Sequence, residues 1–185
     1  MKKMILVVSS LALTLVLIPG TMAAQSAEAP ESVIYDAESA MAFLKTMSGN
    51  WVSAANSGEH GANTPAASFK VAAAGSAVIE TTRAGTPSEM TTVFHMNGDQ
   101  LLQTHYCALM NAPVLRFVPS DTPGELKFVF HGGTNFDPDV DAHFHEGLLQ
   151  IRDKDTVERG FVVYANGKMS TDGSAVLTRA KAATN

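Results

Sequence analysis

Short apolar runs separated by turn residues occupy the chain from Trp51 onwards, at spacings of roughly 8 to 12 residues that are typical of an all-β sandwich or barrel. The runs that qualify as strands are NWVSAA, ASFKVAAA, SAVIETTRA, MTTVFHM, LLQTHYCALM, VLRFV, ELKFVFHG, HFHEGLLQIRD, VERGFVVYA and SAVLTRA. Their connections are short enough for hairpins, and Asn97-Gly98 accepts the positive φ of a tight one. Because a closed meander removes the exposed edges of a flat sheet, the pattern predicts a single antiparallel up-and-down β-barrel of about ten strands.

One segment ahead of the strands, DAESAMAFLKTMSG, has a helical period instead. Asp36 stands at the N-cap position, and Gly49 follows where a helix would end. An apolar stripe with the spacing of one helix face lies between them and consists of Ala40, Phe43, Leu44 and Met47. The segment therefore predicts one short N-terminal helix on an otherwise all-β fold.

The N-terminal segment has the features of a secretory signal peptide. Two lysines precede an apolar run, and small residues follow Pro19-Gly20, as at a cleavage site. The run is shorter than the roughly 20 residues that cross a bilayer, and no cysteine follows it to carry a lipid. The sequence predicts 1–23 as a signal peptide, 24–35 as a flexible tail and 36–185 as the barrel domain of a periplasmic or secreted protein.

The charge of the chain bears on its partners. The formal net charge is −5, and without the two lysines of the first segment 11 basic residues face 18 acidic ones. Nucleic-acid phosphates and anionic membrane surfaces repel an acidic protein, so neither is expected as a partner after signal cleavage. Cys107 is the only cysteine, which excludes an internal disulfide and leaves packing to stabilise one ordinary core.

Two features at opposite ends of the barrel sequence resemble the calycin pattern of lipocalins and their relatives. Gly49-Asn50-Trp51 opens the first strand, and Arg179 lies near the end of the last one. In calycins, the tryptophan of a Gly-x-Trp motif packs under a basic side chain from the final strand and closes one end of the barrel. The resemblance implies that Gly49, Trp51 and Arg179 form this closure, with the guanidinium stacked on the indole.

Longer phrases are similar to those of uncharacterised exported bacterial proteins with a lipocalin-like barrel. They include a His-Tyr-Cys phrase at 105–107, a His-x-His phrase at 143–145 and the stretch YANGK. This resemblance covers most of the chain after the helix and implies a fold and an exported location rather than a reaction. Nitrobindin-like haem proteins are a more distant likeness, because Ser53 and Ala55 stand where their Gly-x-Trp-x-Gly-x-Gly opening has glycines. Haem and a divalent metal both stay open as cofactors.

His143 and His145 are one residue apart in DAHFHEGLLQIRD. On a regular strand alternate residues face one side, so both histidines share a face with Leu149 and Ile151. The opposite face ends in polar and charged residues. We therefore expect the histidine face to line the barrel interior near one mouth, and Glu146 to point away from it.

Three interpretations of this histidine pair stay open: a polar pocket wall, hydrogen-bonded core residues and a metal site. Zinc requires a third protein ligand, which His105, His95 or Cys107 could supply. The faces of His95 and His105 depend on the hairpin between them. A two-residue loop of Asn97-Gly98 puts them on opposite faces, and a three-residue loop puts them on the same face.

Other polar side chains give weaker indications. Tyr106 and Asn111 could reach a ligand at the pocket mouth, although the Asn-Ala-Pro of 111–113 is equally an ordinary turn. Cys107 and His105 make a poor nucleophile and base, because residues two apart on a strand stand roughly 6.5 to 7 Å apart. The acidic stretch NFDPDVDAHFHE lacks the glycine and glutamate positions of an EF-hand loop, which favours a solvated loop over a calcium site.

These observations predict a periplasmic binding module that holds a small, largely apolar molecule inside a barrel wide enough to leave a cavity. The expected ligand-binding residues are His95, His105, Tyr106, Asn111, His143 and His145. The alternative is a metal-dependent hydrolase or isomerase with a His143/His145 centre and His105 as a candidate third ligand. That centre lacks an obvious general base, since alternation points Glu146 away from it.

Overall fold

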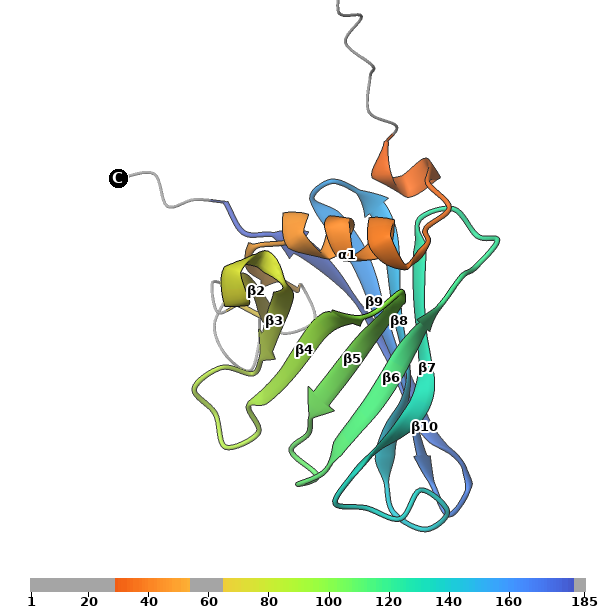
Figure 1. Cartoon of the computed structure of the whole chain (residues 1–185). Coiled ribbons are helices and arrows are strands. Elements are labelled where there is room, and N and C mark those ends of the chain that lie inside the picture. Colours follow the sequence, from red (N-terminus) through yellow and green to blue (C-terminus); the bar gives the residue numbers. More distant parts are fainter. Residues whose placement is uncertain (1–28, 54–64, 182–185) are drawn as a thin grey trace, which may run out of the picture.

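A closed barrel of ten antiparallel strands and one α-helix make up the computed structural model, which describes residues 29–53 and 65–181 (Figure 1). Strands that are consecutive in sequence pair with each other, and β1 pairs with β10 to complete the ring. The elements are α1 (Ala37–Thr46), β1 (Gly49–Val52), β2 (Ala67–Ala72), β3 (Ala77–Thr82), β4 (Met90–Asn97), β5 (Gln100–Tyr106), β6 (Ala112–Val118), β7 (Glu125–Thr134), β8 (His143–Asp153), β9 (Thr156–Ala165) and β10 (Lys168–Arg179). The predicted all-β up-and-down barrel with one helix is confirmed, and the fold is lipocalin-like.

The predicted signal peptide, residues 1–23, lies outside the described residues, and so does the first part of the predicted tail, residues 24–28. The end of the first predicted strand, beyond Ser53, also lies outside them. The last part of the tail forms a short 3-10 turn at Pro30–Ser32. Among residues 29–53 and 65–181, no helix is long and apolar enough to cross a bilayer.

The hairpin between β4 and β5 separates the two histidines that flank it. Its two-residue loop is Gly98-Asp99, one position later than expected, and Gly98 adopts φ +63°. Glycine suits this position because it has no Cβ to clash at positive φ. His105 pairs with Thr92, and both are buried on the inner face, whereas His95 lies on the opposite face.

Strand β10 is longer than the sequence pattern indicates. It begins at Lys168, whereas the apolar alternation starts only at Ser174. Residues 168–173 are mostly polar and still pair with β9, with an irregularity after Met169. Ladder hydrogen bonds join backbone groups whatever the side chains are, so hydrophobic alternation does not reveal this extension.

Helix α1 lies across one end of the barrel (Figure 1). A capping box starts it: the Ser39 N–H donates to Asp36 Oδ1 over 2.8 Å, and the Asp36 N–H donates to Ser39 Oγ over 3.0 Å. A helix of this length is marginal in water, so packing of its apolar face must supply most of its stability. The buried residues include the predicted stripe, Ala40, Phe43, Leu44 and Met47.

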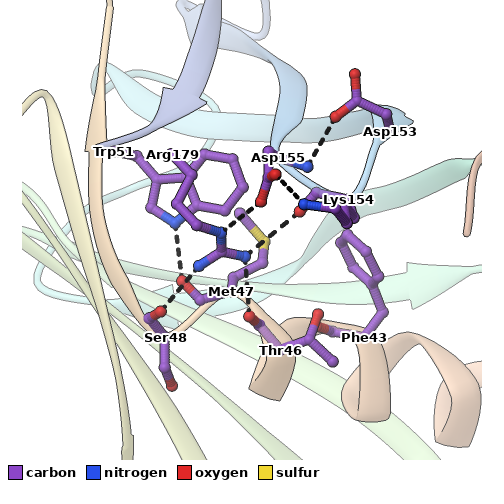
Figure 2. Close-up of polar contacts among 9 residues, drawn as sticks. All are labelled: Phe43, Thr46, Met47, Ser48, Trp51, Asp153, Lys154, Asp155 and Arg179. Carbon is purple, nitrogen blue, oxygen red and sulfur yellow. Dashed lines mark hydrogen bonds and ion pairs between the residues drawn. The ribbon is translucent and has the colours of Figure 1, made fainter. Parts of the chain in front are cut away.

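Arg179 joins the two ends of the barrel sequence at the end that α1 covers (Figure 2). Its guanidinium carbon lies 4.5 Å from the ring centroid of the fully buried Trp51. The same guanidinium donates hydrogen bonds of 3.0 Å to the carbonyl oxygens of Thr46 and Ser48 and to Asp155 Oδ1. Arg179 therefore stacks on the indole and also caps the carbonyl end of α1, where a positive charge is favourable.

Two further contacts surround this closure. The Trp51 Nε1–H donates to the carbonyl oxygen of Met47 over 2.8 Å, so the indole has a polar partner although it is buried. Gly49 adopts φ +120°, a backbone conformation that residues with a side chain rarely adopt, and a Cβ at this position would lie 3.8 Å from Arg179 Nη1. Hydrogen bonds from Lys154 and then from Arg179 hold the pKa of the Asp155 carboxyl below its usual range.

The opposite end of the barrel carries the β3–β4, β5–β6, β7–β8 and β9–β10 connections (Figure 1). Asn111 Nδ2 donates to the Ala142 carbonyl oxygen over 2.8 Å and so joins the β5–β6 loop to the β7–β8 loop. The Asn166 N–H donates to the Val140 carbonyl oxygen over 3.0 Å and joins the β9–β10 turn to the same loop. Three of these connections, β5–β6, β7–β8 and β9–β10, are therefore held together as one rim around the open end.

Replacing Arg179 by methionine should lower the free energy of unfolding by about 2 to 3 kcal/mol, because it removes a stacked cation and four hydrogen bonds made by a charged donor. Arg152→Met is the matched control, since Arg152 forms an ion pair with Glu158 at 2.6 Å on the exposed face. That change should cost less than about 1 kcal/mol. Urea unfolding of both variants measures the difference, and equal losses would show that Arg179 is an ordinary surface cation.

Candidate ligand-binding site

A cavity of about 370 Å³ opens at the end of the barrel opposite α1. Its walls are mainly apolar, and a small number of polar side chains lie among them. This volume and this composition are typical of sites for small organic molecules. The lining includes Leu109, Phe144, Phe161 and Val163 together with Thr82, His105 and Arg159.

An ion pair crosses the lumen at the floor of the cavity. Arg159 Nη1 lies 3.4 Å from Glu80 Oε1, and the Glu80 side chain is only 3% exposed. The two residues belong to β9 and β3, which are not neighbours in the barrel, so the contact spans the interior. The pair lacks hydrogen-bond geometry, and Glu80 Oε1 has no hydrogen-bond partner among the described residues. The carboxylate is thus neutralised by Arg159 but incompletely satisfied.

His105 is the one histidine of the sequence prediction that lines this cavity. Its Nδ1 lies 2.9 Å from Thr92 Oγ1, and its ring lies 4.9 Å from the Phe144 ring. Burial, and then the positive charge of Arg159, lower the pKa of His105 to about 4. The imidazole is therefore neutral at neutral pH and presents a polar but uncharged edge.

A second, much smaller cavity of about 20 Å³ lies next to the first and shares Phe144 and Arg159 with it as a common wall. Its other lining residues include Glu80, Gln103 and Gly147. A space of this size holds a single water molecule when polar groups surround it. Gly147 makes room here, because a Cβ at its position would lie 3.1 Å from the Phe144 ring and 3.3 Å from Gln103 Oε1.

The expectation that His143 and His145 share the inner face with Leu149 and Ile151 is wrong for the histidines. The pairing of β8 with β9 slips between Phe144 and Glu146, so one residue of β8 is left over. A bulge of this kind shifts the alternation by one position. Phe144 therefore joins the interior core, and neighbouring His143 points to the other side of the strand.

The two histidines lie instead in an aromatic cluster next to the β7–β8 loop. The His145 ring stacks on Tyr164, with centroids 3.7 Å apart, and on Phe130, with centroids 5.0 Å apart. His143 is 1% exposed and contacts the rings of Phe130 and Phe136, each at 4.9 Å. None of the five rings lines the 370 Å³ cavity, so the cluster supports the rim rather than the lumen.

A chain of hydrogen bonds sets the tautomers that this pair adopts when both rings are neutral. His143 Nδ1 lies 2.9 Å from the Asp141 carbonyl oxygen, which can only accept, so Nδ1 carries a proton. When His143 is neutral its Nε2 is an acceptor, and His145 Nδ1, 3.0 Å away, must donate to it. Burial and then the proximity of His143 lower the pKa of His145, while Glu146 opposes the shift. The neutral pair therefore leaves a lone pair on His145 Nε2.

The remaining predicted ligand residues lie away from the cavity. His95 is on the outer face of β4, and Tyr106 is 54% exposed. Asn111 is buried, and its amide ties two rim loops together. Of the six residues expected at a ligand, the structure therefore brings only His105 to the cavity wall, while Asn111 and the His143/His145 pair lie in or behind the rim.

The metal candidates are not brought together. His105 is bonded to Thr92 inside the lumen, whereas His143 and His145 lie in the aromatic cluster. Within the part of the chain that the structure describes, no three His, Cys, Asp or Glu side chains form a group that could hold an ion. In the acidic stretch, Asp141 Oδ2 and Asp137 Oδ1 accept hydrogen bonds from N–H groups of their own loop. These carboxylates therefore stabilise the loop fold.

A larger hollow, of about 480 Å³, lies along the outside of β7 to β10. It is bordered by charged groups such as the ion pair between Lys127 and Glu146 at 3.7 Å, whose side chains are 42% and 37% exposed. Gly160 is among the lining residues and contributes no side chain to fill the hollow. Because its polar walls are solvated, this hollow is a surface groove and lacks the convergent buried polar groups of the lumen.

Sequence reasoning missed Glu80, Thr82 and Arg159, which give the lumen its polarity. A signal was present in AVIETT, where strict alternation puts Glu80 and Thr82 on the same face as the apolar Val78. A similar signal in VERGFVV puts Arg159 between Val157 and an aromatic residue. Residues of opposite charge at inward-facing positions of two strands therefore indicate an internal ion pair.

The protein should lose stability on acidification through His105. The pKa of His105 is about 4 in the folded protein, whereas an unfolded histidine has a pKa of about 6.5. Between about pH 4 and about pH 6.5 the unfolded chain therefore binds a proton at His105 and the folded protein does not. The free energy of unfolding should therefore fall as the pH drops from about 6.5 to about 4, by at most about 3 kcal/mol from this residue. His105→Gln should flatten the curve of urea-derived stability against pH over that window, and parallel curves for the two proteins would contradict the assignment.

The hydrogen-bond chain predicts that, in the neutral pair, both His143 and His145 carry the proton on Nδ1. Nitrogen-15 spectra of histidine-labelled protein distinguish protonated from unprotonated ring nitrogens. His143→Gln and His145→Gln assign the signals, with exposed His131 as an internal reference. A proton on His145 Nε2 in the neutral pair would show that His145 Nδ1 does not donate to His143 Nε2, and would contradict the proposed direction of these hydrogen bonds.

Comparison with known proteins adds no family to this picture. Neither a protein-family model nor a curated protein matches the sequence. The lipocalin-like likeness rests on the closed ten-stranded barrel, the helix over one end and the stacking of Arg179 on Trp51. The cavity and its side chains are therefore the features that bear on what the protein binds.

Proposed function

We propose that the protein is an exported binding protein that holds a small, largely apolar molecule in the open end of its barrel. The single observation that carries the proposal is the cavity of about 370 Å³, whose apolar walls surround a few buried polar groups. The opposite end of the barrel is filled by α1, Trp51 and their neighbours, so a ligand would enter at the rim.

The predicted ligand residues then have two different roles. His105 contacts the ligand from the cavity wall. Asn111 and His143 hold the β7–β8 loop through its backbone carbonyls at Ala142 and Asp141, and so they shape the entrance. Export is supported by the lysines, apolar run and small residues of the N-terminal segment, and by the resemblance to exported bacterial proteins. The acidic net charge of −5 supports a small molecule rather than a nucleic acid as the partner.

The proposal predicts saturable binding of N-phenyl-1-naphthylamine, a neutral dye whose fluorescence rises in apolar surroundings. Val163→Trp should weaken this binding at least about tenfold, because an indole would fill space that the ligand needs. Val162→Trp is the matched control, because Val162 is the neighbouring residue of β9 and borders the outer groove instead of the cavity. Fluorescence titration measures both.

Circular dichroism of the two variants checks that each one keeps its fold. Equal effects of the two tryptophans, or no saturable binding by the unmodified protein, would contradict the proposal.

A further inference from the structure

Two buried oxygens on the inner face of β3 have no hydrogen-bond partner among the described residues. They are Thr82 Oγ1 and Glu80 Oε1, and the residues that carry them are 4% and 3% exposed. The two residues are two positions apart on one strand, so both point into the lumen. Thr82 lies on the wall of the 370 Å³ cavity. A buried hydroxyl without a partner is unfavourable, so its place beside a cavity favours a polar group of the ligand as its partner.

The charges around the floor of the cavity cancel. Arg159 faces Glu80 across the lumen at 3.4 Å, so its guanidinium already has an anionic partner. His105 adds no positive charge at neutral pH, because burial holds its pKa at about 4. A carboxylate that entered the lumen would lose its hydration, and the cation that the described residues place at the floor, Arg159, already has an anionic partner. An uncharged polar group avoids both costs.

The part of the cavity above this floor is apolar. Leu109, Phe144, Phe161 and Val163 contribute side chains that can cover a hydrocarbon or aromatic body. A hydroxyl at the inner end of such a body can both donate and accept, as can the hydroxyl of Thr82. Polar groups at the floor and apolar groups at the wall therefore orient a ligand with its polar end inward.

The geometry points to an uncharged amphipathic ligand, which has an apolar body and a terminal hydroxyl that hydrogen-bonds to Thr82, rather than to a carboxylic acid. This inference rests on the proposed function, because it names the chemical class of the ligand in the same cavity. Glu80 acts as the selectivity element, since it compensates Arg159 and makes the lumen unfavourable for anions.

Arg83 provides the competing arrangement. It lines the cavity at its entrance and is exposed. An acid could place its carboxylate beside this residue and its apolar part in the lumen. Because the Arg83 charge lies in water, the attraction would be screened and weak.

The experiment uses three naphthalene derivatives that differ only in the group at one position. 2-Naphthylmethanol carries a hydroxyl, 2-methylnaphthalene has no polar group, and 2-naphthoate carries a carboxylate. Affinities are measured at pH 7.5 by displacement of N-phenyl-1-naphthylamine. The alcohol should bind about fivefold more tightly than the hydrocarbon, and the carboxylate at least about tenfold more weakly than the alcohol.

Two variants separate the contributions of the floor residues. Thr82→Val keeps the shape of the side chain and should reduce the alcohol to the affinity of the hydrocarbon, without changing the hydrocarbon. Glu80→Gln should strengthen the binding of naphthoate, because it leaves Arg159 without its anionic partner. If Glu80→Gln does not fold, Thr82→Val alone still tests the hydroxyl contact.

The outcomes distinguish this inference from the proposed function. If neither the dye nor any of the three compounds binds, the proposed function itself fails. If the hydrocarbon binds but the alcohol binds no better, a ligand occupies the cavity and the hydroxyl contact is wrong. If naphthoate binds most tightly and loses this advantage in Arg83→Gln, the carboxylate lies at the rim and the inference is overturned.

Discussion

The stacking of Arg179 on Trp51 is the contact on which the closed barrel depends. Strand β1 is short, and its ladder with β10 consists of Trp51 opposite Arg179 and Val52 opposite Thr178. So short a seam adds little backbone pairing, and side chains must hold it closed. The guanidinium does this by joining the seam to the Thr46 and Ser48 carbonyls, at and just beyond the end of α1, and to the β8–β9 turn at Asp155. Helix, seam and turn are therefore stabilised by one side chain.

The two ends of the barrel solve different physical problems. At the covered end, apolar side chains and the partnered Trp51 indole fill the interior, and this arrangement favours stability. At the open end, the lumen contains Glu80, Thr82 and Arg159, although apolar residues of similar volume are often as stable as a buried ion pair. Because these polar residues add little to stability, their presence at the cavity is best explained by a role in binding what the cavity holds. The packed end thus supports an open end whose polar floor is incompletely hydrogen-bonded.

The sequence was sufficient for the architecture, because that rests on local rules. Turn residues marked the hairpins, Asp36 marked the helix start, and the Gly-x-Trp phrase implied the closure. The interior chemistry depends on contacts that are remote in sequence. Glu80 and Arg159 meet across the lumen from strands that are not neighbours. The side on which His143 lies depends on a slipped register in β8, and hydrophobic alternation carries no signal for such a slip.

That slip also has a consequence for how such a protein can change. His145 is the extra residue of β8, between Phe144 opposite Val163 and Glu146 opposite Val162. Deleting its codon would restore an uninterrupted strand in which Phe144 still faces inward. A lineage could therefore gain or lose the histidine pair through a single insertion or deletion while the wall of the lumen stayed as it is. The two features of this barrel, an aromatic-histidine cluster behind the rim and a polar floor inside, are free to evolve separately.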